Sequence, residues 1–144
     1  MTILNLTASD IEKITELYRA DFADGWTADM LKSAFDGGRF FALGVKENGF
    51  LLAVISVTVG YDDADIEGVV VAKNSRGRGI AKALITAVEE KLKKDGKERI
   101  LLEVRENNVP ALSLYQGLGF NKISVRKKYY KDGENALVME KVIL

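Results

Sequence analysis

Residues 75–84, SRGRGIAKAL, have the composition of a loop that binds an anion. Two glycines, Gly77 and Gly79, directly precede a helix-forming run. Backbone N–H groups of such a loop, at the positive end of a helix dipole, make a site for a pyrophosphate. The basic side chains of the loop and its helix are Arg76, Arg78 and Lys82. The alternative is a plain strand-to-helix turn whose arginines are solvated.

Two other phosphate-binding loops fit this stretch less well. The Walker loop requires a glycine five residues before Gly79 and a Lys-Ser or Lys-Thr pair after it, whereas Ile80 and Ala81 follow here. The dinucleotide fingerprint G-x-G-x-x-G fits the two glycines, and Glu103 lies about where a ribose ligand should be. However, Lys82 replaces the third glycine, and the chain after Glu103 is too short for the rest of a doubly wound sheet.

A carboxylate near a strand end is the leading candidate for a general base. The chain contains neither His nor Cys, so proton transfer must use Glu, Asp, Lys, Tyr or a terminus. The same absence removes the commonest transition-metal ligands, and we expect no metal. Glu103 interrupts the apolar run ILLEV (100–104), and strand alternation places it on the face of Leu101. The alternative is an ordinary surface carboxylate paired with Arg105.

A tyrosine and an asparagine of the next expected helix also have two interpretations. Leu112 and Leu118 flank Tyr115 at helical spacing, as they would flank a core tyrosine whose hydroxyl is bonded locally. Asn107 or Asn108 can cap the start of this helix. Neither residue is assigned a function by its spacing alone.

Strands and helices alternate along the chain around these residues. Apolar alternation and turn residues predict strands over residues 3–7, 40–45, 50–59, 66–72, 100–104, 120–125 and 134–142. Helical spacing predicts helices from Ser9 or Asp10 to about Phe22, after Thr27, from the glycine loop to about Lys94, and up to Gly117 or Gly119. Asn48-Gly49 predicts a tight hairpin turn. Meander strands mixed with two crossover helices indicate an α+β domain with a mixed sheet.

The composition of the chain is typical of a single ordered domain. The 144 residues, 47% apolar and 29% charged with a single Pro, suit one ordered domain over residues 1–144. Lys+Arg and Asp+Glu number 21 each, so no net field favours nucleic acid or a membrane surface as a partner. No leader or membrane-length apolar run is visible in the sequence, and we expect a cytoplasmic protein.

Taken together, these segments resemble the GNAT N-acetyltransferase superfamily, and within it the RimI-type ribosomal-protein alanine N-acetyltransferases. The likeness rests on VVVAKNSRGRGIAKAL and LLEVRENNVPALSLYQGLGF, within residues 66–120, and extends into RKKYYKDGENALVME. The loop fits R-x-x-G-x-[GA] from Arg76 to Ala81. Three positions depart from the pattern: Lys73 stands where Pro is frequent, Ala81 replaces a Gly, and Asn135 replaces an Asp.

The resemblance implies a GNAT fold, with a mixed, mostly antiparallel sheet of six to seven strands and helices on both faces. It implies acetyl-CoA as cosubstrate and direct acetyl transfer through a tetrahedral intermediate, with Glu103 as the base and Tyr115 as the acid that protonates the thiolate. The backbone of Val69, Val70 and Val71 would face the pantetheine arm, which Asn108 would also reach. The pyrophosphate would lie on the loop and helix start formed by Arg76, Gly77, Arg78, Gly79, Ile80, Ala81 and Lys82.

The acceptor expected from this resemblance is a protein N-terminal α-amine, in particular the N-terminal alanine of a ribosomal protein. Presenting a neutral lysine amine at pH 7 costs about 3 kcal/mol more than presenting a neutral α-amine, and a glutamate base suits the α-amine better. The alternatives are a GNAT that acetylates a small-molecule amine or a lysine, and a catalytically silent acetyl-CoA-binding module.

Two variable segments are expected to form the acceptor groove. The stretch ADFADGWTAD (20–29) is acidic and aromatic and would suit a cationic peptide, or else it is a solvated loop with its aromatics in the core. Tyr129 and Tyr130 are candidate walls of the groove, although tyrosines beside a turn are common in strands.

Overall fold

The computed structural model describes residues 1–21 and 25–144. Its strands form a seven-stranded sheet in the order β1-β2-β3-β4-β5-β7-β6, in which the β4–β5 pair is parallel and the others are antiparallel. The strands are β1 (Ile3–Leu6), β2 (Phe40–Glu47), β3 (Phe50–Val59), β4 (Asp63–Val71), β5 (Arg99–Arg105), β6 (Asn121–Arg126) and β7 (Ala136–Val142). The predicted α+β fold is therefore confirmed.

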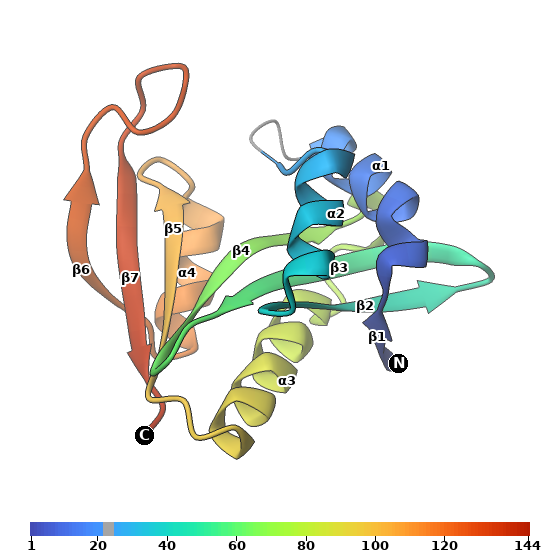
Figure 1. Ribbon diagram of the computed structural model, residues 1–144. Coiled ribbons are helices and arrows are strands. Elements are labelled where there is room, and N and C mark those ends of the chain that lie inside the picture. The colour runs from blue at the N-terminus through green and yellow to red at the C-terminus, as the bar shows by residue number, and fades with distance from the viewer. Residues whose placement is uncertain (22–24) are drawn as a thin grey trace.

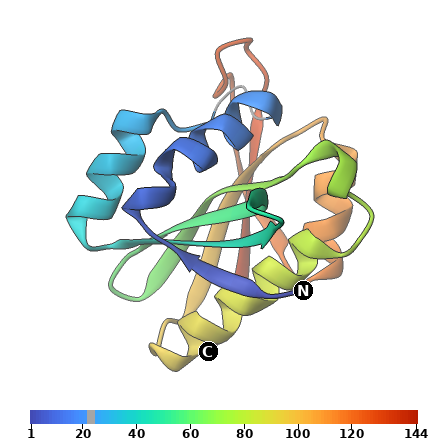
Figure 2. The ribbon, with the colours of Figure 1, turned by 90° about the vertical axis from the view of Figure 1, so that its right-hand side faces the viewer.

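Helices cover both faces of this sheet (Figures 1 and 2). They are α1 (Ile11–Asp21), α2 (Ala28–Gly37), α3 (Ile80–Lys94) and α4 (Val109–Gly117), with short 3-10 turns η1 (Ala8–Asp10) and η2 (Lys73–Ser75). The α1 and α2 helices pack on one face around Ile14, Leu31 and Val54, which are buried. The α3 helix buries Leu84 and Val88 against the other face, where the apolar side chains of α4 also pack. No helix in the described part of the chain is long and apolar enough to span a bilayer.

The hairpin between β2 and β3 forms as predicted. Asn48 has a φ of 52° and Gly49 a φ of 81°, the pair of positive angles that a type I′ turn requires. The predicted cap of α1 was wrong, because Thr7 begins the helical segment through the turn η1. The Thr7 hydroxyl accepts a hydrogen bond from Ser9 N, and the Asp10 carboxylate accepts one from Thr7 N, so Ser9 and Asp10 are residues of a capping box.

The β4 strand begins three residues before the predicted start at residue 66. Asp63 and Asp65 alternate with the buried Ala64 and Ile66, which is the pattern of a strand with one polar face. Asp62 and Asp63, which indicate a turn in the sequence, end the turn in which the Gly60 N–H donates to the Asp63 carbonyl, and Asp63 is also the first residue of the strand. As a result, acidic residues lie on the face of β4 that carries α1 and α2.

The parallel strands β4 and β5 stay together for only part of their length. Their register runs from Asp63 opposite Arg99 to Ile66 opposite Leu102. Beyond this point β4 continues to Val71 and remains paired with β3. Figure 1 shows the two strands meeting at the lower edge of the molecule and separating above it. One edge of β4 therefore faces the gap between the two halves of the sheet.

Candidate active site

A cleft of about 730 Å³ opens where β4 and β5 separate. Residues of α4 and of the loop between β6 and β7 complete its lining. Six residues predicted to bind acetyl-CoA or to act in catalysis line it, namely Val69, Val70, Arg76, Glu103, Asn108 and Tyr115. The fold thus brings the start of the glycine loop, the candidate base and the candidate acid to one site.

The glycine loop has the backbone conformation of an anion cradle. Gly77 and Gly79 have φ angles of 81° and 76°, which disfavour any residue with a Cβ. A Cβ added at either position would meet no atom within 4 Å, so the backbone there is open to a ligand. The α3 helix begins at the buried Ile80, and its N-cap, Gly79, supplies no side-chain acceptor to the first turn. These features fit a pyrophosphate at the positive end of α3.

The three basic side chains of the loop and its helix lie in different surroundings. Arg76 lines the cleft, and its Nε donates a hydrogen bond to the Val71 carbonyl at 3.2 Å. Arg78 instead forms an ion pair with Glu47 of the β2–β3 hairpin, with Nη2 and Oε2 at 2.7 Å. A hydrogen bond from this guanidinium lowers the pKa of the Glu47 carboxyl. Lys82 is exposed on the first turn of α3, and Ala81 beside it is half-buried.

The three valines before the loop lie at the open edge of β4. Val69, Val70 and Val71 pair with β3 on one side, in register with residues 53–55. Val69 and Val70 line the cleft on the other side. The backbone of Val69 and Val70 thus borders the cleft, and its pairing with an extended ligand, which the resemblance implies, stays a prediction.

Glu103 lies on the solvent side of β5, between the buried Leu102 and Val104. Its partners come from the C-terminal hairpin: Arg126 Nε lies 3.5 Å from Glu103 Oε1, and the Tyr129 hydroxyl hydrogen-bonds the carboxylate. Burial and this hydrogen bond raise the pKa of Tyr129. The charges around Arg105 are Asp132 and Glu134, at 2.9 and 3.5 Å. Glu103 is held by the hairpin at the mouth of the cleft.

Tyr115 reaches the cleft from α4. Its ring packs edge-on against Phe120, with centroids 5.9 Å apart, and burial raises its pKa to about 12. Within residues 1–21 and 25–144 its hydroxyl has no hydrogen-bond partner, so the interpretation as a locally bonded core tyrosine is wrong. A protonated hydroxyl facing a cleft is available to donate a proton or a hydrogen bond.

Asn108 caps α4 and lines the cleft as well. Its Oδ1 accepts a hydrogen bond from Ala111 N at 3.2 Å. The carbonyl oxygen of its side chain is thus occupied by the cap, and a contact with an extended ligand would fall to its amide nitrogen.

A protein family model matches most of the chain that forms this cleft. The model described as "Acetyltransferase (GNAT) family" matches residues 11–120. The chain belongs to the GNAT acetyltransferase family. Its glycine loop, the open edge of β4, Glu103 and Tyr115 all lie within or beside the cleft of this GNAT fold.

Individual relatives agree with this assignment. The chain is 30% identical over 141 residues to the [Ribosomal protein bS18]-alanine N-acetyltransferase of Escherichia coli, covering 96% of this chain and 95% of the relative. It is 31% identical over 161 residues to an N-alpha-acetyltransferase of Saccharolobus solfataricus, covering 96% and 90%. The crystal structure of the ribosomal-protein-S18-alanine N-acetyltransferase from Escherichia coli superposes with a TM-score of 0.91 at 30% identity, over 99% of this chain and 93% of that one.

A more distant structure shares the fold. Arabidopsis thaliana NAA60, solved in complex with acetyl-CoA, matches with a TM-score of 0.86 at 20% identity over 99% of both chains.

The two segments expected to form the acceptor groove of this GNAT acetyltransferase are placed in part. Tyr130 lines the cleft under the Arg105 guanidinium, 4.1 Å from its ring centroid. Trp26 stacks on Phe40 at 5.5 Å between centroids, partly buried, so this aromatic belongs to the packing of α2. The predicted Phe22 and Asp24 lie outside the described residues.

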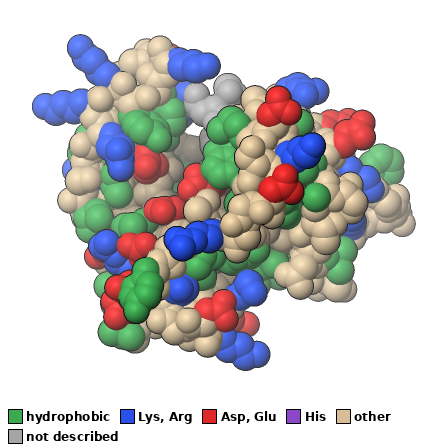
Figure 3. Space-filling model, in the orientation of Figure 1, with side chains coloured by type: hydrophobic (Ala, Val, Ile, Leu, Met, Phe, Trp, Pro, Cys, Tyr) green, Lys and Arg blue, Asp and Glu red, His purple; other side chains and the backbone are tan. Residues whose placement is uncertain are grey.

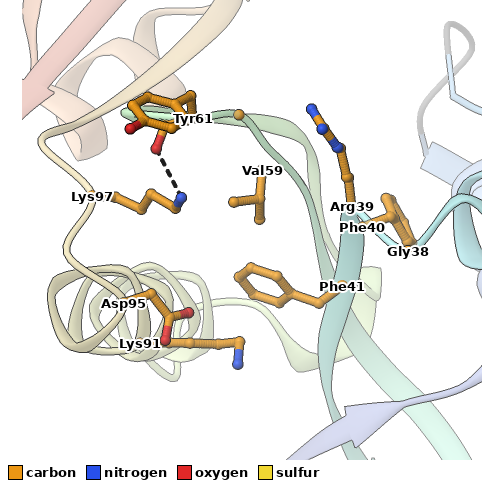
Figure 4. Close-up of a pocket in the computed structure, with 10 residues that line it drawn as sticks. Gly38, Arg39, Phe40, Phe41, Val59, Tyr61, Lys91, Asp95 and Lys97 are labelled. Atoms are coloured by element: carbon orange, nitrogen blue, oxygen red, sulfur yellow. Dashed lines mark hydrogen bonds between the residues drawn. The ribbon is translucent and has the colours of Figure 1, made fainter.

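A second hollow of the GNAT domain, about 510 Å³, lies between β2, β3 and the end of α3 (Figure 4). Both of its lysines have partners: Lys97 donates to the Tyr61 carbonyl at 2.9 Å, and Lys91 lies over the Phe41 ring at 5.2 Å. None of the predicted site residues lines it. The residues predicted to bind acetyl-CoA or to act in catalysis line the cleft between β4 and β5 instead.

Sequence reasoning missed one carboxylate of the cleft. Glu67 of β4 lines the cleft with Glu103. Burial, together with the nearby charges of Asp65 and Glu103, raises its pKa. It is the second residue of the predicted strand 66–72, where no sequence pattern distinguishes it, and the residues of β5 that approach it are distant in sequence.

Proposed function

We propose that this chain acetylates the N-terminal α-amine of a protein with acetyl-CoA, and that its acceptor is the N-terminal alanine of a ribosomal protein. The observation that carries the proposal is the cleft itself, in which Glu103 and Tyr115 lie together beside the glycine loop. The choice of acceptor is supported by the Escherichia coli relative, whose name gives an alanine of protein bS18 and which this chain matches over almost its whole length.

Acetyl-CoA supplies an activated acetyl group and a thiol leaving group. The pyrophosphate would lie at Gly77, Gly79 and the first turn of α3, where the backbone is open and positive. Arg76 and Lys82 would add charge there, and Arg78 would do so after leaving Glu47. The backbone of Val69 and Val70 would align the extended arm along β4.

Glu103 accepts a proton from the acceptor nitrogen, since its carboxylate is at the mouth of the cleft and held in place by Arg126 and Tyr129. Tyr115 donates its proton to the departing sulfur. Its raised pKa keeps the hydroxyl protonated throughout the physiological range, so the donor is present at every turnover.

A panel of acceptors tests the proposal. Free CoA release is measured with peptides that begin with alanine, with the same peptides blocked at the N-terminus, with free lysine and with polyamines. We expect turnover with the free alanine peptides and none with the blocked ones. Turnover confined to lysine or polyamines contradicts the acceptor, and tight acetyl-CoA binding without turnover contradicts catalysis.

A further inference from the structure

Acetylation of an amine removes two protons from one nitrogen. An α-amino group has a pKa of roughly 7.7–8.0, so the acceptor arrives at pH 7 mostly as an ammonium ion. One proton must leave before the nitrogen has a lone pair for attack, and a second must leave once the new N–C bond has formed. One of the two protons is balanced by the proton that the CoA sulfur gains, and the other goes to solvent. Glu103 alone accounts for one of these transfers.

A second carboxylate lies in the same cleft because β4 is irregular there. Ser56 of β3 is in register with Gly68, and Val57 is in register with Ile66, so Glu67 is the extra residue of a β-bulge. A bulge redirects a side chain out of the regular alternation of a strand, and bulges are frequent beside active sites. Here the bulge falls directly after Ile66, the last residue of β4 paired with β5. Glu67 is thus presented at the point where the cleft begins.

The groups around Glu67 come from every neighbouring element. Asp65 lies two residues before it on β4, and Glu103 lies on β5. Tyr18 of α1 and Tyr129 of the hairpin loop are also close enough for their pKa values to be raised by its charge. The Thr58 hydroxyl of β3 hydrogen-bonds the carboxylate.

Glu67 lies near other carboxylates, although Arg76 and Arg105 line the same cleft and Arg126 pairs with Glu103. Figure 3 shows acidic side chains close together in the middle of this face, between α1 and α2 on one side and the β6–β7 hairpin on the other. Burial and the like charges of Asp65 and Glu103 raise the pKa of Glu67, which makes it a better proton acceptor than an ordinary carboxylate. An ammonium ion entering between Glu67 and Glu103 would relieve the repulsion between them.

We infer that Glu67 takes the first proton from the acceptor ammonium and that Glu103 takes the second. An N–H bond breaks and an O–H bond forms on Glu67, which releases this proton to water before the next turnover. The freed lone pair attacks the acetyl carbonyl, and Glu103 then accepts the proton left on the nitrogen. The proton on Glu103 replaces the one that Tyr115 gives to sulfur. This inference rests on the proposed amine acetylation and adds a residue to it.

The pH dependence of kcat/KM for an alanine peptide, at saturating acetyl-CoA, tests the inference. The wild type uses the ammonium form, so its kcat/KM should change less than about twofold between pH 6.5 and 7.5. Glu67→Gln can use only amine already neutral in solution, so its kcat/KM should rise about eightfold over the same interval and approach the wild-type value by about pH 9. The matched control is Glu90→Gln, an exposed carboxylate of α3 outside the cleft, which should keep the wild-type profile.

The shape of each pH profile decides whether Glu67 takes the first proton. A Glu67→Gln profile parallel to that of the wild type overturns the inference, whatever its height. Glu67→Asp keeps a carboxyl and should keep the flat profile, so a steep profile in this variant also overturns it. Unchanged acetyl-CoA affinity and thermal midpoint in each variant separate the effect from misfolding.

Failure of the proposed acceptor is distinguishable. If the wild type acetylates only lysine or a polyamine, the proposed acceptor is wrong. The role of Glu67 is then tested with that amine, and kcat/KM of Glu67→Gln should keep rising to about pH 10.4. If the wild type acetylates no amine, the acceptor and the role of Glu67 both fall.

Discussion

Arg126 Nε lies 3.5 Å from Glu103 Oε1, and this contact joins the last hairpin of the fold to the strand that carries the proposed base. Both side chains are partly exposed, at 57% for Arg126 and 30% for Glu103, and exposed ion pairs contribute about 0–1 kcal/mol. The contact therefore orients Glu103 and adds little to the stability of the fold.

Glu103→Gln should lower kcat by about 10²-fold, because general-base catalysis contributes factors of this order. The loss should be similar from pH 6.5 to 9, since the second proton must leave the nitrogen at every pH. Arg126→Gln is the matched variant and should cost no more than about fivefold in kcat. Steady-state kinetics with acetyl-CoA affinity measured in parallel check both. Wild-type kcat in Glu103→Gln contradicts its assignment as base.

Tyr115→Phe should lower kcat by about 10²-fold and leave acetyl-CoA affinity within about twofold, since it removes a proton donor and no part of the glycine loop. The pKa of Tyr115, raised to about 12 by burial, means that the donor is not lost as pH rises to 10, so the wild type should show no alkaline loss from this group below that pH. Tyr61→Phe, at an exposed site far from the cleft, is the control and should behave as wild type. A fall in kcat near pH 8 that is absent in Tyr115→Phe would contradict the role of Tyr115 as the proton donor.

Gly77→Ala and Gly79→Ala should weaken acetyl-CoA binding by about tenfold. An L-residue at a positive φ costs about 1–2 kcal/mol, and relaxing the loop moves its N–H groups away from the pyrophosphate. Gly49→Ala is a matched control, because Gly49 also has a φ of 81° and open space around a Cβ, but lies in the β2–β3 turn. It should lose similar stability and keep its acetyl-CoA affinity. Equal losses of acetyl-CoA affinity in all three variants would show that the loop is not part of the binding site.

Alkaline pH should destabilise the fold through Tyr18. Burial raises the pKa of Tyr18 to about 12, although its hydrogen bond with Ser56 opposes the shift. The unfolded chain loses this proton near pH 10 and the folded chain does not, so the free energy of unfolding falls by up to about 1.4 kcal/mol per pH unit between 10 and 12. In Tyr18→Phe the fall should be smaller by that amount. Urea unfolding at pH 9 and 11 measures the difference, and identical slopes in the two proteins would contradict it.

Much of the site follows from local sequence patterns. Positive-φ glycines before a helix, a carboxylate that interrupts an apolar strand and the order of strands and helices are properties of short segments, and the structure brings Glu103 and Tyr115 to one cleft as expected. The residue that caps the first helix was not predicted correctly, because Thr7 acts through a 3-10 turn that shifts the helix start.

The remaining features depend on contacts between distant segments. Glu67 enters the cleft because β3 and β4 lose register by one residue, which no single-strand pattern reveals. Arg78 is drawn to Glu47 across 31 residues of sequence. The cleft itself exists because β4 and β5 diverge after Ile66, a consequence of how both strands pack in the whole sheet.

The position of the acetyl group on one peptide tests the central claim most directly. The peptide begins with a free alanine and contains one internal lysine, and fragment masses after reaction with acetyl-CoA locate the added acetyl group. We predict acetylation at the N-terminal nitrogen, reduced by about 10²-fold in rate in Glu103→Gln. Acetylation of the lysine alone, or no acetylation in the presence of bound acetyl-CoA, would contradict the account.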